Sequence, residues 1–350
     1  MIESASSAPL VSVLMVARNV AHFIDAALHS VLAQTLRQIE VVVVDDGSTD
    51  ETAEIVRDHV GKDPRVRLMD GPRMGLSAVR NTSLAAARAP FVAIVDADDL
   101  LHPQHLEWLL EHQAATGAQI CASNMASFFQ STDGVQAAAF AAAPRWRRAR
   151  RITANEFVRC GMIGGREVSL GYFKPLLARA FLLENGIRYD EGLRIGEDFD
   201  LLFRAMLAGA RFEFLPRISY FYRRHAQSTS HRLALDDLAG LIAATRGYSA
   251  NEAGLAALLR ARLANLEGAR RQLLALDALR ERRILDALRV AGPHREARRL
   301  VLSSLRESCI KRLGLWDAAQ TGGDAQKRMP LSAADLVPLM RALSPAGALT

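Results

Sequence analysis

The chain has 350 residues, half of them hydrophobic, with a formal net charge of +6 and a pI near 9.6. This length and composition exclude a disordered chain and allow a globular protein of two domains with a sizeable core. The positive charge comes mostly from arginines spread along the chain, so we expect no nucleic-acid partner. Cys121, Cys160 and Cys309 lie far apart and have neither disulfide-framework nor zinc-ligand spacing, which indicates a reduced, cytoplasmic setting.

A membrane-spanning segment is not expected. The first ten residues, MIESASSAPL, contain an acid and no basic region, which argues against a signal peptide. No run of about 18 apolar residues occurs, so any membrane contact is expected to be peripheral, at the inner face. The basic cluster Arg145–Arg151 around Trp146 has two interpretations, a solvated loop or a patch for anionic lipid or a phosphorylated acceptor.

The first hundred residues alternate between strand and helix patterns. The predicted elements are, in order, strand 10–17, helix 22–36, strand 39–44, helix 49–60, strand 66–69, helix 77–88 and a strand beginning at Phe91. The continuous Val/Ile run of the second strand is typical of a strand buried on both faces. Ser48 and Glu51 form a predicted capping box for the second helix. This alternation predicts a mostly parallel, Rossmann-like sheet flanked by helices.

The second half of the chain changes character. Residues 103–116 read as a helix, 118–152 as a less regular stretch, 197–207 as a helix with an acidic start, and 212–223 as a strand. From about Leu233 the sequence is rich in Ala, Leu and Arg with helical spacing. We therefore predict an α/β domain over residues 1–230 and an α-helical C-terminal extension over residues 231–350, with the last twenty residues loosely ordered.

The stretch FVAIVDADDL, Phe91 to Leu100, ends an apolar run in three carboxylates. If the strand continues through them, Asp96 and Asp98 share one face and Asp99 points to the other. Two carboxylates about 6 Å apart at an effective dielectric constant near 20 repel by roughly 3 kcal/mol, which favours binding of a cation. Hard oxygen ligands suit Mg²⁺ or Mn²⁺, and ligands of open α/β sheets bind at the carboxyl ends of strands. The alternative is a solvated strand end.

Five motifs in order carry a resemblance to a known family: VSVLMVARN, VVVVDDGSTDET, GLSAVRN, FVAIVDADD and GEDFDLLFR. Over roughly residues 10 to 230 the chain resembles the family 2 glycosyltransferases of the GT-A fold. The resemblance implies an inverting, metal-dependent enzyme that moves a sugar from a nucleotide-diphosphate donor to an acceptor hydroxyl. The implied setting is polysaccharide or glycolipid synthesis, with a saccharide or a lipid-linked acceptor.

The resemblance also assigns roles to residues. The residues it places at the donor are Ala17, Arg18, Asp45, Asp46, Arg80, Asp96 and Ala97. It makes Asp98 the direct ligand of a divalent metal (Mg²⁺ or Mn²⁺), with Asp96 beside it and His225 as a further ligand or phosphate contact. The alternative for Asp45 is a turn residue that bonds its own backbone, and for Arg80 a surface arginine.

Asp198 matches the general base that takes the proton of the acceptor hydroxyl. Glu197 and Asp200 remain candidates for that base, because reach and pKa decide the role. All three acids also suit the dipole at a helix N-terminus. Lys174 and Trp146 lie where acceptor contacts are often made in this fold.

Two other functions compete with this one. An aspartate-based phosphatase would use DADD as nucleophile and acid, although Asp99 stands where such enzymes usually have Thr or Val. A non-catalytic nucleotide-sugar-binding or scaffolding module would keep the fold and use the helical extension as its interaction surface. The sequence leaves the donor, the acceptor and the oligomeric state open.

Overall fold

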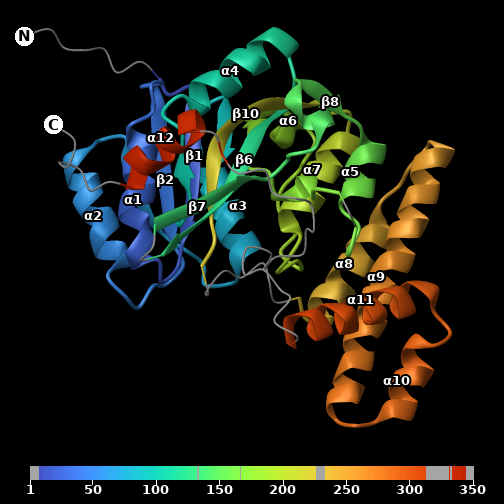
Figure 1. Ribbon diagram of the computed structural model, residues 1–350. Coiled ribbons are helices and arrows are strands. Elements are labelled where there is room, and N and C mark those ends of the chain that lie inside the picture. Colours follow the sequence, from blue (N-terminus) through green and yellow to red (C-terminus); the bar gives the residue numbers. More distant parts are fainter. Residues whose placement is uncertain are drawn as a thin grey trace, which may run out of the picture.

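The computed structural model describes residues 8–131, 134–165, 167–225, 233–312, 331 and 333–343. It has a central mixed sheet with helices on both faces and a group of C-terminal helices beside it (Figure 1). The strands are β1 (Val11–Ala17), β2 (Ile39–Asp45), β3 (Val66–Asp70), β4 (Phe91–Ile94), β5 (Leu100–Leu101), β6 (Ile120–Ser131), β7 (Gly134–Ala139), β8 (Arg150–Ile152), β9 (Leu176–Ala178) and β10 (Phe212–Arg223). The α-helices are α1 (Ala21–Leu32), α2 (Thr52–Lys62), α3 (Leu76–Ala86), α4 (His105–Thr116), α5 (Ala154–Cys160), α6 (Arg179–Glu184), α7 (Glu197–Leu207), α8 (Leu235–Gly247), α9 (Ala253–Arg280), α10 (Ile284–Ala291), α11 (Arg295–Arg312) and α12 (Ala333–Leu343).

The N-terminal half of the sheet has the predicted parallel order. Its strands run β3-β2-β1-β4, and each neighbouring pair is parallel. Every residue of β2 is buried, because β2 lies between β1 and β3 with helices covering both faces. The side chains that follow these strands consequently meet at one edge of the sheet.

The second half of the sheet is mixed. Strand β9 lies antiparallel between β4 and β6, and β10 pairs parallel with β6 but antiparallel with β5 and β8. The prediction of a less regular stretch over residues 118–152 was wrong, because the stretch contains β6, β7 and β8. The sequence of β6, ICASNMASFFQS, has few β-branched residues, and its pairing with β7, β9 and β10 outweighs this low intrinsic preference.

Two predicted boundaries also differ from the structure. Ser48 does not cap α2: its hydroxyl bonds the Asp45 carboxylate, and the side chain of Asp50 instead accepts from the backbone N of Thr52 at 3.1 Å. Strand β4 ends at Ile94, so the acids of FVAIVDADDL lie in the turn beyond the strand. The alternation of faces predicted for these acids therefore does not apply.

The C-terminal helices make two separate packing arrangements. The long helix α9 packs against α5, α8, α10 and α11, and its Arg262 donates a 2.7 Å bond to the Gly161 carbonyl oxygen. Helix α12 returns to the sheet, where Leu339 packs with Leu100 and Phe221 (Figure 1). The prediction of loose order for the last twenty residues falls in part on residues 332 and 344–350, outside the described residues. Among the helices that the structure describes, none combines the length and apolar character needed to cross a bilayer.

Candidate active site

A cleft of about 900 Å³ opens at the edge of the sheet where the parallel strands β1, β2 and β4 end. The predicted site residues that line it are Ala17, Arg18, Asp46, Arg80, Asp96, Ala97, Asp98, Glu197 and Asp198. Apolar side chains such as Phe140 and Met162 line other parts, and α8 and α9 contribute Leu241 and Leu266. The cleft therefore joins the α/β domain to the helices that follow it.

Arg80 stands at the centre of a buried ion network. It projects from α3, and its guanidinium contacts Asp198, Asp96 at 3.2 Å and Glu197 at 3.6 Å. The hydroxyl of Tyr189 adds a bond to Asp198 at 3.1 Å. Burial disfavours the charge, but the carboxylates, led by Asp198, outweigh it and raise the pKa of Arg80. The alternative of a surface arginine is wrong, since the Arg80 side chain is only 6% exposed.

Lys174 joins the two acids that the motifs place far apart in sequence. Its Nζ lies 2.8 Å from Asp198 Oδ2 and 2.9 Å from Asp96 Oδ2. The side chain is buried, which disfavours its charge, but Asp198 and Asp96 outweigh this and raise the pKa of Lys174. One ammonium group thus holds the first acid of DADD beside the first turn of α7.

Replacing Lys174 with methionine is expected to lower the free energy of unfolding by about 3–5 kcal/mol, because it leaves buried carboxylates without one of their cations. Urea unfolding followed by circular dichroism measures this. Lys62→Met is the matched control, because Lys62 pairs with Asp58 at 2.6 Å but is 70% exposed. Its expected loss is small, because solvent screens an exposed ion pair. Equal losses in the two variants would contradict the structural role of Lys174.

The DADD turn brings three carboxylates together. Asp96, Asp98 and Asp99 each offer an oxygen within 4.8 Å of the others. Asp99 is buried and accepts bonds of 2.7 Å from the Tyr220 hydroxyl and from the Arg223 backbone N. Burial, and then the charges of Asp98 and Asp96, raise the pKa of Asp99 well above its usual range. Negative charge is therefore crowded here, which is the condition that a bound cation relieves.

His225 closes the other side of this turn. Its Nε2 lies 2.9 Å from Asp98 Oδ2, and its ring lies 4.7 Å from that of Phe23. The chain reaches this position because β10 runs directly beneath the turn, where Arg223 Nε donates a 2.7 Å bond to the Asp98 carbonyl oxygen. Two carboxylates and one imidazole, all hard or borderline donors, form a set that fits a divalent cation.

Glu197 and Asp198 begin α7 next to a glycine that the backbone requires. Gly196 has a φ of +82°, and a Cβ there would lie 2.6 Å from the Leu241 side chain. With Gly196 in this left-handed conformation, the chain turns sharply into α7, and both acids line the cleft. Burial, and then the charge of Asp198, raise the pKa of Glu197 to about 7. The third candidate base, Asp200, lies outside the cleft lining and bonds Arg204 Nε and the Tyr248 hydroxyl, both at 2.8 Å.

The raised pKa of Glu197 predicts a pH dependence of stability. Between the usual pKa near 4.5 and the folded-state pKa near 7, the folded chain binds more protons at Glu197 than the unfolded chain. The contribution of Glu197 to stability is therefore full below about pH 4.5 and is lost as pH rises toward 7. Glu197→Gln should remove this slope in unfolding free energies measured from pH 5 to 7. An unchanged slope in Glu197→Gln would contradict the raised pKa of Glu197.

Comparison with known proteins places the chain in a family. The profile described as "Glycosyl transferase family 2" matches residues 12–170. The chain is 36% identical over 287 residues to the succinoglycan biosynthesis protein ExoO of Rhizobium meliloti, covering 81% of each chain. The chain is a family 2 glycosyltransferase.

Solved structures agree on the fold of the transferase. S. aureus TarS 1-349 in complex with UDP-GlcNAc superimposes with a TM-score of 0.60 at 19% identity, covering 82% of this chain and 92% of the TarS 1-349 chain. The mannosyltransferase PcManGT from Pyrobaculum calidifontis, in complex with GDP-Man and Mn²⁺, gives a TM-score of 0.56 at 17% identity and covers 96% and 86%. The predicted GT-A architecture with a helical C-terminal part is thereby confirmed.

In the cleft of the transferase, Asp46 directly follows β2. Its Oδ1 accepts a 2.7 Å bond from the Arg73 backbone N, and its Oδ2 lies 3.7 Å from the exposed guanidinium of Arg18. Gly71 allows the next strand end to pass closely, because a Cβ there would lie 2.8 Å from Asp46 Oδ1. Asp45 lies outside the cleft lining and accepts bonds from Ser48, so it has the turn contacts of the alternative interpretation.

Some contacts of the transferase were missed or misplaced by sequence reasoning. Tyr189 and Tyr220, which hold Asp198 and Asp99, lie in no motif. Lys174 was expected at the acceptor, not between two acids. Trp146 is buried against Phe214 and lies outside the cleft lining. Within the neighbouring basic cluster, Arg145 and Arg150 stack on Trp146 and pair with Glu167 and Glu156.

Proposed function

We propose that the cleft binds a nucleotide-diphosphate sugar together with a divalent metal and transfers the sugar, with inversion, to the hydroxyl of a saccharide or lipid-linked acceptor. The observation that carries this proposal is the convergence of Asp96 and Asp198 on one cation, Lys174, in a cleft that Asp46 and Asp98 also line. Acids that follow β2 and β4, together with acids in the first turn of α7, thus line a space of about 900 Å³, large enough for a donor and part of an acceptor.

On the donor side, the nucleotide lies along the ends of β1 and β2. Asp46 offers an acceptor for an imide N–H of the base, and Ala17 and Arg18 line the adjoining wall. Arg80 supplies positive charge near the phosphates, and Asp96 and Ala97 line the part of the cleft assigned to the ribose. The support for these roles is the position of each side chain in the cleft.

The metal is proposed to be Mg²⁺ or Mn²⁺, held by Asp98 with Asp96 and His225. The converging oxygens of the DADD turn support a cation at this place. When bound, the ion would act as a Lewis acid that balances the charge of the departing diphosphate.

Asp198 is proposed as the general base. Its carboxylate is positioned by Arg80, Lys174 and Tyr189 and reaches the cleft at the start of α7. As the acceptor oxygen bonds the anomeric carbon, Asp198 takes the hydroxyl proton, and the bond from that carbon to the diphosphate oxygen breaks with its electron pair. One displacement from the opposite face inverts the anomeric centre. Glu197, which lines the same cleft, is the second candidate.

The acceptor is proposed to enter along the part of the cleft lined by Phe140, Tyr172 and Leu241. Aromatic and apolar side chains there suit a sugar face or a lipid-linked glycan. We further propose a cytoplasmic enzyme that touches the inner face of the membrane. The support is α10, where Ile284 and Leu285 are 62% and 70% exposed beside exposed arginines. Sedimentation with anionic vesicles tests this contact, and a chain that stays in the supernatant would contradict it.

A thermal-shift screen tests donor binding. The probes are UDP- and GDP-sugars, each with and without Mn²⁺, because a ligand that binds only the native state raises the melting temperature, and a tighter ligand raises it further. We expect at least one donor to stabilise the chain more strongly with Mn²⁺ than without it. Binding without turnover on a broad panel of acceptors would favour the scaffolding module, and hydrolysis of generic phosphate esters would favour the phosphatase. No stabilisation by any donor would contradict the proposal.

A further inference from the structure

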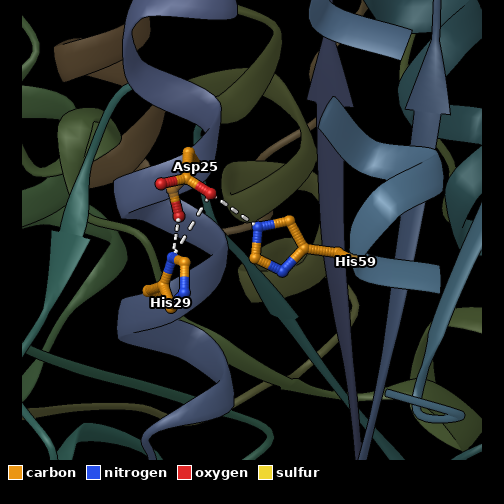
Figure 2. A group of neighbouring side chains, drawn as sticks. All are labelled: Asp25, His29 and His59. Atoms are coloured by element: carbon orange, nitrogen blue, oxygen red, sulfur yellow. Dashed lines mark hydrogen bonds and ion pairs between the residues drawn. The ribbon is translucent and has the colours of Figure 1, made fainter. Parts of the chain in front are cut away.

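A second group of metal-ligating side chains lies apart from the cleft, where α1 packs against α2. Asp25 and His29 are four residues apart on α1 and so share one face of the helix. His59 comes from α2 (Figure 2). The figure shows the carboxylate and the two imidazoles pointing toward one another, and one ligand atom of each lies within 4.8 Å of the others.

The distances suit a small tetrahedral ion. Asp25 Oδ1 lies 2.8 Å from His59 Nε2 and 3.4 Å from His29 Nδ1. Ligand atoms on a zinc ion with bonds of about 2.0–2.1 Å are about 3.3 Å apart, close to the distance from Asp25 to His29. The shorter distance to His59 is a hydrogen bond that the ion would replace. His29 Nδ1 also lies 2.9 Å from the Asp25 carbonyl oxygen, a contact that the imidazole would exchange for the metal.

Burial and donor chemistry distinguish this group from the DADD turn. The His59 side chain is only 6% exposed, so its ring is fixed by packing, whereas those of Asp25 and His29 are 60% and 51% exposed. The exposed side gives an ion a route of entry and leaves a position for water. Two imidazoles and one carboxylate suit Zn²⁺ and similar ions, while the oxygen-rich DADD turn suits Mg²⁺ or Mn²⁺.

We propose that Asp25, His29 and His59 bind one Zn²⁺ ion that links α1 to α2. The same two helices are joined near the cleft, where the Val20 backbone N donates to Thr52 Oγ1 at 2.9 Å, and Val20 lines the cleft. An ion further along the helices would therefore fix a helix pair whose start borders the donor site.

Equilibrium dialysis of the full-length protein against Zn²⁺ tests the proposal. His29→Gln removes one ligand at an exposed position, and His22→Gln is the matched control, because His22 is an exposed histidine on the same helix outside the group. We expect the wild type and His22→Gln to bind one more Zn²⁺ than His29→Gln. Losing an outer-shell partner weakens metal binding roughly 10- to 100-fold, and losing a direct ligand should cost at least as much. The difference between variants cancels any Zn²⁺ bound at the cleft.

Co²⁺ gives a second readout, since tetrahedral Co²⁺ absorbs visible light far more strongly than octahedral Co²⁺. The strong bands should appear in the wild type and in His22→Gln and be absent from His29→Gln. Equal Zn²⁺ stoichiometry in all three proteins, or no bound Zn²⁺ in the wild type, would overturn the proposal. Sugar transfer should persist in His29→Gln, so failure here would leave the proposed function standing.

Discussion

Turnover of the Asp198→Asn variant is expected to fall by roughly 10²- to 10⁴-fold, the usual contribution of a positioned general base. Asparagine keeps the shape of the side chain and can still accept a bond from Lys174 or Arg80 through its amide oxygen, but it cannot take the acceptor proton. Donor affinity should change little, because the side chains proposed to contact the nucleotide and the metal, Asp46 and Asp98, are left unchanged. Transfer rates and calorimetric donor binding, measured on the same preparation, separate the two effects.

Asp200→Asn is the matched control for Asp198→Asn. Asp200 belongs to the same turn of α7 and is buried, but it bonds Arg204 and Tyr248 outside the cleft lining. We expect this variant to lose stability and keep turnover. Wild-type transfer by Asp198→Asn would show that another residue is the base. A loss of transfer in Asp200→Asn or Glu197→Gln, measured at equal folded fraction, would identify which one.

Asp98→Ala is expected to lower metal-dependent transfer by roughly 100-fold or more, because the Lewis-acid contribution of a metal amounts to several kcal/mol. The increase in donor binding on addition of Mn²⁺ should also disappear. Asp58→Ala is the control, since Asp58 is an exposed acid paired with Lys62 on α2. Calorimetric titration of the donor with and without Mn²⁺ measures the effect. A variant that kept the full Mn²⁺ dependence would show that Asp98 is not the ligand.

Parts of the fold could be predicted because local sequence and final packing agree. The Val/Ile run of β2 predicts a strand buried on both faces, and β2 is such a strand between β1 and β3. For β6 they disagree, because its alanines and serines have low strand preference and only the partners around it, distant in sequence, make it a strand. The boundary of α2 failed for a related reason, since Ser48 bonds Asp45 and is not available as a cap.

Contacts between residues distant in sequence also limit what could be predicted of the site. The motifs placed Asp46, Arg80, Asp98 and Asp198 in one site, and all four line the cleft. Asp46 and Asp98 follow strand ends, whereas Arg80 lies on α3 and Asp198 begins α7. Their electrostatic partners are separated in sequence by long stretches, as Lys174 is from Asp96 and Tyr220 is from Asp99. No spacing rule connects such residues. The mixed half of the sheet brings these partners together, and that half is the part of the fold that the sequence patterns predict least well.

The configuration of the transferred sugar tests the central claim most directly. In the mechanism proposed above, a single displacement assisted by Asp198 as the base converts an α-linked nucleotide sugar into a β-linked product. The coupling constant of the anomeric proton in the NMR spectrum of the product reports this configuration. We predict the β-anomer from an α-linked donor; an α-linked product would require two displacements or a front-face reaction and would contradict the mechanism proposed for this cleft.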